Sequence, residues 1–476
     1  MDDDARQPCR RGEARGRRHA RPRPPLGGDR NGGRRARRRD AGGAGGPRGA
    51  GGSATGFTVK ERSQRRPEPS ASPLRLVHET WGDHEALLAR TRTVSGGRVG
   101  QVDTRSLTVA TPDAPLELQR GGVLRHVDVA FETYGTLNEA GDNAILICHA
   151  LTGSAHAAGV HEGGQVPGWW DPLIGPGKAI DTDRWFVVSS NVLGGCYGTT
   201  GPSSVDPEGG EPYGPSFPRY TIRDMVHVQK RLIDALGVTR LASVIGGSMG
   251  GMHVLEWAAS YPEWVGSLVP IASCARHSAW AIGLNEVARR AIASDPAWQE
   301  GRYAPDAQPE AGLGLARAIA MLSYRSHDSL EAKFGRERVS SERVVGTGEG
   351  GSRTDELSRA LSVGFEIESY LAYHGVQLSR RFDANTYLYL TRAMDEHDVA
   401  EGRGRLADVL AAMSMPALVM GIDTDVLYPE REQRILVEHM PNARYEVLRS
   451  PHGHDAFLIE FPQLAAQLRR FLSSLA

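Results

Sequence analysis

One short motif restricts the folds open to this chain more than any other feature of the sequence. Residues 241–251 read Leu-Ala-Ser-Val-Ile-Gly-Gly-Ser-Met-Gly-Gly, and an apolar helical pattern follows at 253–259. A sharp turn between a strand and a helix leaves no room for side chains two positions before or after the serine, so Gly246 and Gly250 are required there. The hydroxyl of Ser248 would then stand above a sheet at a helix N-terminus, which stabilises a developing anion. We therefore predict a nucleophilic serine rather than a structural turn or a dinucleotide site, for which the G-x-G-x-x-G pattern is missing.

Apolar runs and helical patterns alternate along most of the chain. The clearest helix spans 221–236, where Thr221 is the predicted N-cap and Gly237 the stop. Continuous apolar runs are typical of strands buried on both faces of a parallel sheet. They lie at 126–134, 144–149, 185–191, 241–246, 266–273, 417–421 and 445–448. This alternation predicts an α/β fold with a mostly parallel central sheet.

The segment 275–413 breaks the alternation, because it has no apolar run typical of a buried strand. It contains a glycine-rich loop at 346–352 and helical patterns at 279–292, 312–324, 365–374 and 386–394. An all-helical block inside an α/β chain predicts a cap (lid) inserted over the active edge of the sheet. We expect the core to be divided by this cap into 73–274 and 414–476.

The N-terminal segment differs from the rest in charge. The whole chain has 56 Lys and Arg against 57 Asp and Glu, which argues against a nucleic-acid-binding role for the whole protein. Residues 1–70 alone hold 19 basic and 8 acidic residues, with 14 Gly and 7 Pro. With few aliphatic residues to bury, residues 1–72 are predicted to be disordered. We favour a dispensable extension over an arginine-rich arm for nucleic acid at 34–39.

The same composition bears on the location of the protein. No run of eighteen apolar residues is present, and no apolar stretch follows the basic start, so neither a membrane span nor a secretory signal is expected. Four cysteines without C-x-x-C spacing argue against a disulfide scaffold and a cysteine-rich zinc site. We expect a cytoplasmic protein with reduced thiols.

A serine nucleophile needs a histidine base that an acid orients, and in an α/β-hydrolase fold the acid and the histidine follow the serine along the chain. The predicted strand 417–421 leads into Ile-Asp-Thr-Asp-Val-Leu-Tyr-Pro. Asp423 and Asp425 both qualify as the acid. Asp423 could instead cap the turn, so the residues alone favour Asp425 only slightly.

The histidine is expected after the last predicted strand, 445–448, which leads into Ser-Pro-His-Gly-His-Asp-Ala-Phe. His452 and His454 compete for the role. Gly453 gives the chain the freedom to bring the next ring over the serine, and a helix is predicted to start directly at Asp455. We therefore favour His454.

Two backbone N–H groups are candidates for an oxyanion hole. One belongs to Met249, directly after the serine, and the other to Leu151, in the loop after the predicted strand 144–149. Ser154 and His156 in the same loop are interpreted as shaping the loop. No histidine pair has metal-ligand spacing with a nearby acid on a helix, so we expect neither a metal nor a bound cofactor.

Several long blocks, from about Leu107 to the C-terminus, make the chain resemble the homoserine O-acetyltransferase family, acyltransferases of the α/β-hydrolase fold. The blocks are His149-Ala-Leu-Thr-Gly, Gly175-Pro-Gly-Lys-Ala-Ile-Asp, Asn191-Val-Leu-Gly-Gly-Cys-Tyr-Gly-Thr-Thr-Gly-Pro-Ser-Ser, Gly246-Gly-Ser-Met-Gly-Gly, Arg381-Phe-Asp-Ala-Asn-Thr-Tyr and Gly453-His-Asp-Ala-Phe. Blocks of this length are far more specific than G-x-S-x-G alone.

The resemblance implies a role for each matching residue. It places the nucleophile on Ser248, the base on His454, and the acid on Asp425, the second aspartate of Asp-x-Asp-x-Leu-Tyr-Pro. It also implies two substrate contacts, Arg317 in Leu315-Ala-Arg-Ala-Ile-Ala and Asp455. A guanidinium pairs with a carboxylate, and a carboxylate pairs with an ammonium, so the two together would select an amino acid.

The resemblance further implies a homodimer that acetylates L-homoserine from acetyl-CoA, in methionine biosynthesis, by a ping-pong mechanism. Two alternatives stay open at this point. The same triad could use water as acceptor, which would make the protein an esterase or thioesterase. Relatives of this fold also use succinyl-CoA as donor or L-serine as acceptor.

Overall fold

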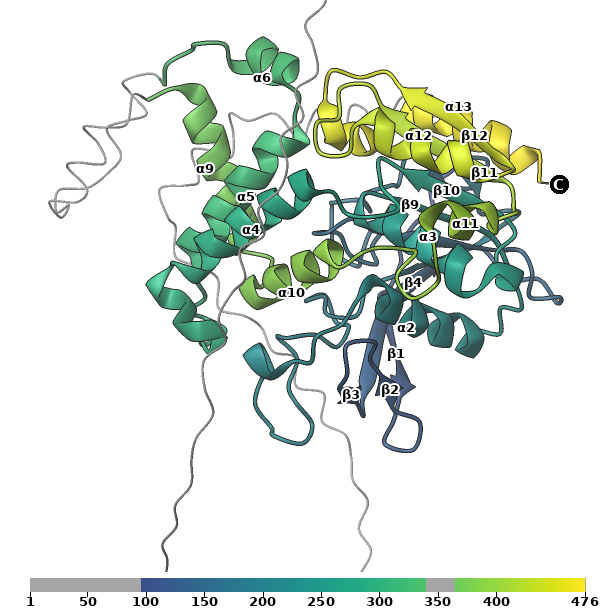
Figure 1. The fold of residues 1–476 in the computed structure, drawn as a ribbon, viewed down its shortest axis with the longest axis horizontal. Coiled ribbons are helices and arrows are strands. Elements are labelled where there is room, and N and C mark those ends of the chain that lie inside the picture. The colour runs from purple at the N-terminus through teal and green to yellow at the C-terminus, as the bar shows by residue number, and fades with distance from the viewer. Residues whose placement is uncertain (1–95, 340–363, 476) are drawn as a thin grey trace, which may run out of the picture. The chain divides into compact units, whose positions relative to one another are not determined.

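An eight-stranded sheet forms the centre of the computed structural model, which describes residues 96–339 and 364–475 (Figure 1). The strand order is β1-β4-β8-β5-β9-β10-β11-β12, and only the pairs β1–β4 and β4–β8 are antiparallel. The strands are β1 (Arg105–Ala110), β4 (Val127–Tyr134), β5 (Ala144–Cys148), β8 (Phe186–Ser190), β9 (Leu241–Gly247), β10 (Leu268–Ile271), β11 (Ala417–Ile422) and β12 (Ala443–Leu448). The prediction of a mostly parallel α/β sheet is confirmed. Two small sheets lie outside it, β2 (Leu116–Glu117) with β3 (Val123–Leu124) and β6 (Ile174–Gly175) with β7 (Ile180–Asp181).

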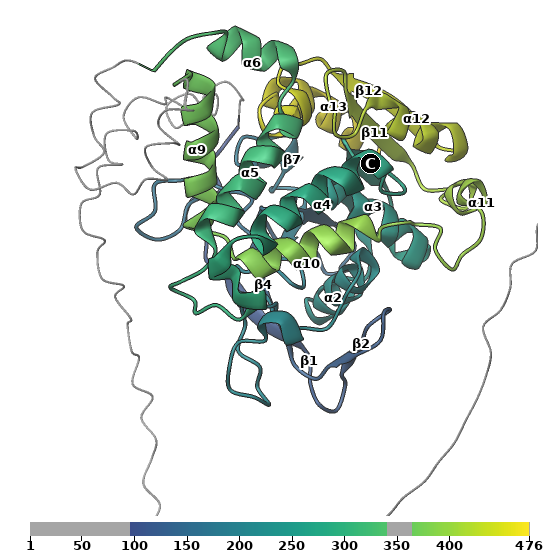
Figure 2. The ribbon, with the colours of Figure 1, turned by 60° about the vertical axis from the view of Figure 1, so that its left-hand side comes forward.

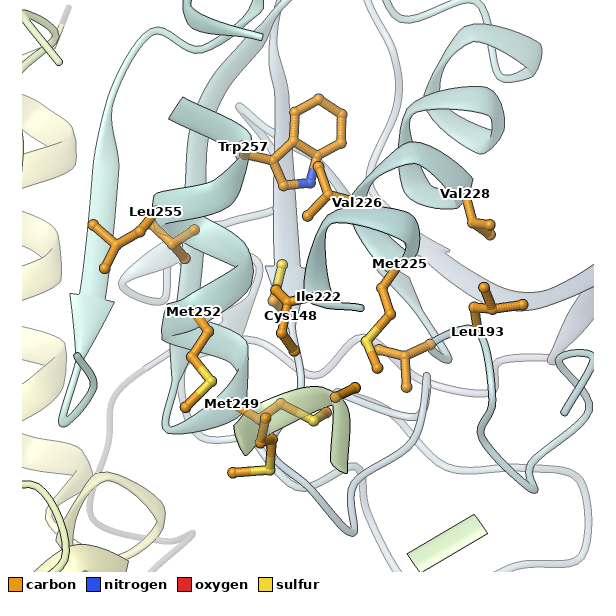
Figure 3. Close-up of a cluster of buried hydrophobic side chains, with 14 of the residues drawn as sticks. Cys148, Leu193, Ile222, Met225, Val226, Val228, Met249, Met252, Leu255 and Trp257 are labelled. Atoms are coloured by element: carbon orange, nitrogen blue, oxygen red, sulfur yellow. The ribbon is translucent and has the colours of Figure 1, made fainter. Parts of the chain in front are cut away.

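The inner parallel strands are buried on both faces, as their continuous apolar runs predicted, whereas the edge strand β12 is mostly half-buried. In β5, Leu146 and Cys148 belong to one hydrophobic cluster, and Ile145 and Ile147 belong to another. The first cluster is covered by α2 (Ile222–Ala235), α3 (Met249–Ser260) and α12 (Glu430–His439), and the second by α13 (Phe461–Ser473). Figure 3 shows side chains of α2 and α3 packed together around Cys148.

Helix α2 starts and stops where its sequence predicted. Thr221 accepts a hydrogen bond from the N–H of Asp224, and the Asp224 side chain accepts one from the N–H of Thr221, which forms a capping box. Gly237, which follows the C-cap, has φ +77°, a conformation that glycine adopts without strain. These local signals fix the helix on which one face of the core is built.

Between β10 and β11 the described residues form helices and loops. The helices are α4 (Ala279–Ala293), η4 (Pro296–Gly301), α5 (Glu310–Tyr324), α6 (His327–Phe334), α9 (Glu366–Ser379), α10 (Ala384–Asp395) and α11 (Leu406–Ala411). Helix α4 contacts α5 and α10, and α5 contacts α9 (Figure 2). The four predicted helical patterns are therefore present, whereas α6 and α11 were not predicted. We refer to α4, α5, α9 and α10 as the cap helices.

Two of the sequence expectations fall outside the described residues, namely disorder at 1–72 and the glycine-rich loop at 346–352. Residues 71–476, which include all the described ones, form one unit of the chain. Of the helices that can be described, none combines the length and the apolar character needed to cross a bilayer.

The expectation of a helix that starts at Asp455 is wrong. The chain forms a short 3₁₀ turn, η5 (Gly453–Leu458), and α13 begins only at Phe461. Pro462 occupies the first turn of α13, where the missing N–H costs nothing, and this favours the later start. Other 3₁₀ turns are η2 (Gly214–Ser216) and η3 (Pro262–Trp264). The histidine region therefore lies in a separate turn, which contacts α5 of the cap.

Candidate active site

Ser248 occupies a strained turn between β9 and α3. Its backbone has φ 58° and ψ −124°, a conformation that is costly for a residue with a side chain. Its N–H donates to the carbonyl of Ile271 on β10 at 2.9 Å, and its carbonyl accepts from the Ser273 hydroxyl at 2.8 Å. The residue is 6% exposed and lines a cavity under the cap. Neighbouring strands thus hold the serine in the conformation that a nucleophile elbow requires.

The glycines on either side of Ser248 are required for steric reasons. A Cβ atom on Gly246 would lie 2.5 Å from the carbonyl oxygen of Gly250, and one on Gly250 would lie 2.1 Å from that of Cys148. Both contacts are far inside van der Waals distance and involve backbone atoms that cannot turn away. The sequence argument for glycine two positions before and after the serine is therefore confirmed.

Asp425 and His454 meet at the ends of adjacent strands. Nδ1 of His454 lies 2.7 Å from Oδ2 of Asp425, and both side chains are almost completely buried. The other oxygen, Oδ1, accepts the N–H groups of Leu427 at 2.8 Å and Tyr428 at 2.9 Å. These two bonds fix the carboxylate, and the carboxylate fixes the imidazole ring.

The two rejected candidates have other partners. Asp423 accepts the N–H of Ser450 at 3.0 Å and lies 3.5 Å from the guanidinium of Arg449, so it ties two loops together. Nδ1 of His452 lies 3.4 Å from Nη2 of Arg325, the residue directly after α5. Of the two candidate aspartates and the two candidate histidines, Asp425 and His454 are the ones that contact each other directly.

His454 lies in the surroundings of Ser248. Tyr324 and Tyr428 line the same cavity as the serine, and their ring centroids lie 5.7 and 5.3 Å from that of His454. Phe457, whose ring is 5.5 Å from that of His454, lies against Gly247. Among the described side chains there is no hydrogen bond from Ser248 Oγ to His454, and such contacts are commonly loose in free enzymes and tighten with substrate.

The charge of Asp425 changes the basicity of His454. Burial lowers the pKa of His454, but the attraction and hydrogen bond of Asp425, together with the charge of Asp455, raise it above its usual 6.5. The proton at Nδ1 faces the carboxylate, so Nε2 keeps its lone pair. A ring with this tautomer and a raised pKa is suited to take a proton from a hydroxyl group.

The two N–H groups predicted for an oxyanion hole come from different elements near Ser248. Met249 is the first residue of α3, and Leu151, which lines the cavity with Ser248, follows β5. Within the described part of the chain, neither N–H donates to a backbone carbonyl. Their role as oxyanion donors therefore stays a prediction.

His149 holds the Leu151 loop in place. Its Nδ1 donates to the carbonyl of Ala150 at 2.7 Å, and its Nε2 accepts the N–H of Val192 at 3.2 Å. Burial lowers the pKa of this histidine to about 4, so the ring is neutral, as these two bonds require. Sequence reasoning missed this residue, although it opens the block His149-Ala-Leu-Thr-Gly.

Arg317 and Asp455 come from the cap and from η5, as the resemblance implied. The guanidinium of Arg317 lies 5.5 Å from the ring centroid of Tyr324, and its charge acts on Asp455. The ion-pair contact of Asp455 is with Arg325, at 4.0 Å. Burial raises the pKa of Asp455 above its usual value, and the charges of Arg317, His454 and Arg325 oppose this rise only in part. Arg325 was not predicted, because one arginine at the end of a helix carries no sequence signal.

One group among the described residues has the chemistry of a metal site. The side chains of Glu132, His156 and His161 offer ligand atoms that lie within 4.8 Å of one another. The Glu132 carboxylate already receives hydrogen bonds from both histidines, Thr104 and Tyr134, at 2.7 to 3.1 Å. Burial raises the pKa of Glu132, but these bonds outweigh it and lower the pKa to about 2. The contact of His156 Nδ1 with Glu132 ties the loop after β5 to β4.

Residues 143–461 match the family model of the alpha/beta hydrolase fold, so the chain belongs to the α/β hydrolases. A homoserine O-acetyltransferase of Carboxydothermus hydrogenoformans is 50% identical over 385 residues, which cover 80% of this chain and 97% of that protein. The chain therefore belongs to the homoserine O-acetyltransferase family of acyltransferases.

Solved structures agree with the fold. The crystal structure of homoserine O-acetyltransferase from Bacillus anthracis is similar with a TM-score of 0.70 and 28% identity, over 78% of this chain and 98% of that one. The crystal structure of esterase E22 is similar with a TM-score of 0.68 and 31% identity, over 78% of this chain and all of that one.

Proposed function

We propose that this chain transfers the acetyl group of acetyl-CoA to the hydroxyl group of L-homoserine and so forms O-acetyl-L-homoserine. Ser248, Asp425 and His454 are the proposed catalytic residues. The observation that supports the chemistry most directly is the 2.7 Å contact between His454 and Asp425, beside the strained turn of Ser248. The similarity to homoserine O-acetyltransferases over 80% of the chain supports the choice of substrates.

The first half-reaction acylates the serine. Nε2 of His454 takes the proton of the Ser248 hydroxyl as Oγ attacks the thioester carbonyl. The N–H groups of Leu151 and Met249 stabilise the oxyanion of the tetrahedral intermediate. When the intermediate collapses, the carbon–sulfur bond breaks and His454 gives its proton to the sulfur, so CoA leaves as the thiol and acetyl-serine remains.

The second half-reaction regenerates the serine. His454 takes the proton of the homoserine hydroxyl, whose oxygen attacks the acetyl carbonyl. Collapse breaks the bond to Ser248 Oγ, which takes the proton back from His454. Water competes for the acyl group, and the low exposure of Ser248, at 6%, limits its access.

Acceptor selection is proposed to depend on two charges, one on α5 of the cap and one on η5, the turn that holds His454. The guanidinium of Arg317 would bind the carboxylate of homoserine, and the carboxylate of Asp455 would bind its ammonium group. Arg325 lies 4.0 Å from Asp455, and its charge opposes part of the rise that burial causes in the pKa of this carboxyl group. An acceptor without both charges would leave at least one of these groups unpaired, which disfavours it.

Ester hydrolysis is the second candidate function. It is favoured by the likeness to esterase E22, a protein whose name describes a hydrolase and which shares 31% identity with this chain. The same serine, acid and histidine serve both reactions, so the triad does not separate them. The two functions differ in the molecule that accepts the acyl group, homoserine or water.

One experiment tests both candidates. The purified full chain is given acetyl-CoA or succinyl-CoA together with homoserine, serine or no acceptor, and CoA thiol release is followed. We expect fast turnover only with acetyl-CoA and homoserine, and the product O-acetylhomoserine. Thiol release that does not depend on homoserine would establish the hydrolase instead.

We further propose a homodimer formed through the cap. Helix α5 carries exposed apolar side chains on one face, with Leu315 at 55% and Leu322 at 50% exposure, seven positions apart. Gly314 and Gly375 bring α5 and α9 close together behind this face. Light scattering is expected to show a dimer for the wild-type chain and a monomer for Leu315→Glu, and a monomeric wild type would refute the proposal.

On the same family likeness we propose that the reaction belongs to methionine biosynthesis, which uses the acetylated product. A cytoplasmic location follows from the use of acetyl-CoA. It is supported by the described cysteines, Cys148, Cys196 and Cys274, which are free thiols. Fractionation of the native host with an antibody against the protein tests this location.

A further inference from the structure

Tyr428 contacts the acid, the histidine and the segment that leads into the cap. Its backbone N–H donates to Oδ1 of Asp425 at 2.9 Å, and its ring centroid lies 5.3 Å from that of His454. Its hydroxyl oxygen lies 2.9 Å from Nε2 of His277. The residue is 1% exposed and lines the cavity beside Ser248. A displacement of Tyr428 would therefore move atoms at the reacting centre.

His277 connects Tyr428 to two cap helices. Its Nδ1 lies 3.2 Å from Oδ1 of Asp395, the last residue of α10. Nη2 of Arg289, on α4, lies 2.6 Å from the other oxygen of Asp395, and Asn285 donates to the first oxygen at 2.8 Å. The side chains of Asp395 and Arg289 are only 4% and 9% exposed. The same nitrogen of Arg289 also donates to Glu286 of α4 at 2.9 Å, so the guanidinium is shared between the two carboxylates.

The neighbours of His277 indicate which ring nitrogen carries the proton. Nδ1 lies 3.2 Å from a carboxylate oxygen of Asp395, a contact that does not have hydrogen-bond geometry, and a carboxylate beside a ring nitrogen favours the tautomer with the N–H at Nδ1. Nε2 then has a lone pair, and the hydroxyl of Tyr428 donates to it. Burial raises the pKa of Tyr428, so the hydroxyl keeps its proton. Arg289, Asp395, His277 and Tyr428 form a buried series of polar contacts, which we call the Tyr428 chain.

We propose that the Tyr428 chain is a positioning device for acylation, which holds Tyr428 against Asp425 and His454 and fixes the acid loop relative to the cap. The inference rests on the function proposed above and names further residues for the same site. These residues act through Asp425 and His454 and do not touch the reacting atoms, so they are positioning residues.

Two substitutions each remove the contact between Tyr428 and His277 and so interrupt the Tyr428 chain. Tyr428→Phe removes the hydroxyl and keeps the ring, and His277→Leu removes the acceptor at similar volume. With acetyl-CoA and no homoserine, the rate constant of the thiol burst reports acylation, and its amplitude reports the fraction of competent sites. We expect each variant to acylate about tenfold more slowly, with the amplitude unchanged. The double variant is expected to be no slower than either single one, because both substitutions break one contact.

Tyr389→Phe is the matched control. Like Tyr428→Phe, it removes one tyrosine hydroxyl, here from α10. That hydroxyl donates to the carbonyl of Phe217 at 2.8 Å and is not part of the Tyr428 chain. The control is expected to acylate at the wild-type rate.

Three outcomes would contradict the inference. Acylation by Tyr428→Phe within about twofold of the wild type would overturn it. So would losses that multiply in the double variant, or a lower amplitude at an unchanged rate, which would mean a purely structural role. These results leave the proposed function standing if the wild-type chain gives a burst. A wild-type chain without a burst overturns both.

Discussion

Replacing Asp425 by asparagine keeps the shape of the side chain and reverses its role toward His454. Oδ1 of the asparagine can still accept the N–H groups of Leu427 and Tyr428, at 2.8 and 2.9 Å. The amide NH₂ group then takes the place of Oδ2, 2.7 Å from Nδ1 of His454. Because an NH₂ group donates, it favours the tautomer with the proton on Nε2, which cannot accept the proton of the serine.

Two effects set the size of the loss. The wrong tautomer at an otherwise intact site lowers acylation about 10⁴-fold, which corresponds to about 5.5 kcal/mol of activation free energy. The pKa of His454 also falls, because burial lowers it and the main opposing charge, Asp425, is gone. In the wild type, acylation is lost as the pH drops through a pKa above 6.5. In Asp425→Asn, this limb of the profile moves to lower pH.

Single-turnover thiol release from acetyl-CoA, measured across the pH range, tests both effects. Asp423→Asn is the control, since Asp423 lies in the same loop and bonds Ser450 instead of the histidine. We expect the control to acylate within about threefold of the wild type. The reasoning is refuted if Asp425→Asn keeps a tenth of the wild-type rate, or if the control is the variant that loses activity.

Three further substitutions test separate parts of the site, and a fourth, Gly283→Ala, serves as a control for one of them. Ser248→Ala is expected to abolish both turnover and the thiol burst, and a normal burst would show that another residue is acylated. Arg317→Ala is expected to acylate normally, while discharge by homoserine slows about a hundredfold, as stopped-flow kinetics can show. Gly250→Ala places a Cβ 2.1 Å from the carbonyl oxygen of Cys148, so thermal melting should show a loss of about 3 kcal/mol. Gly283→Ala, at an exposed position of α4 with nothing within 4 Å, should gain up to about 1 kcal/mol, and equal effects of the two glycine changes would contradict the steric argument.

Local physics explains which parts of the site the sequence predicts. The clearance at Gly246 depends mainly on the backbone of Gly250, four residues further on, so this part of the turn is local to the motif, whereas the clearance at Gly250 depends on Cys148 at the end of β5. The strands are predicted because burial on both faces requires continuous apolar runs. Strand β1 was missed because it lies at the sheet edge with mostly exposed or half-buried residues, which leave no such run.

Contacts between distant segments left no local signal. The bond between His277 and Tyr428 joins residues 151 positions apart, and no pattern around either residue indicates the other. The choice between Asp423 and Asp425 was nearly even on residues alone for the same reason, and it depends on the partner, His454, 29 positions away from Asp425. Only the resemblance to a family, and then the geometry, separated the two aspartates.

The central claim is that an acetyl group passes through Ser248 to homoserine, and the most direct measurement is to map that group. The full chain is mixed with acetyl-CoA, quenched with acid within the burst, digested, and sequenced by mass spectrometry. The account predicts acetylation of Ser248 alone, which disappears when homoserine is added before the quench, as O-acetylhomoserine forms. An acetyl group on any other residue, or one that disappears equally fast without homoserine, would contradict it.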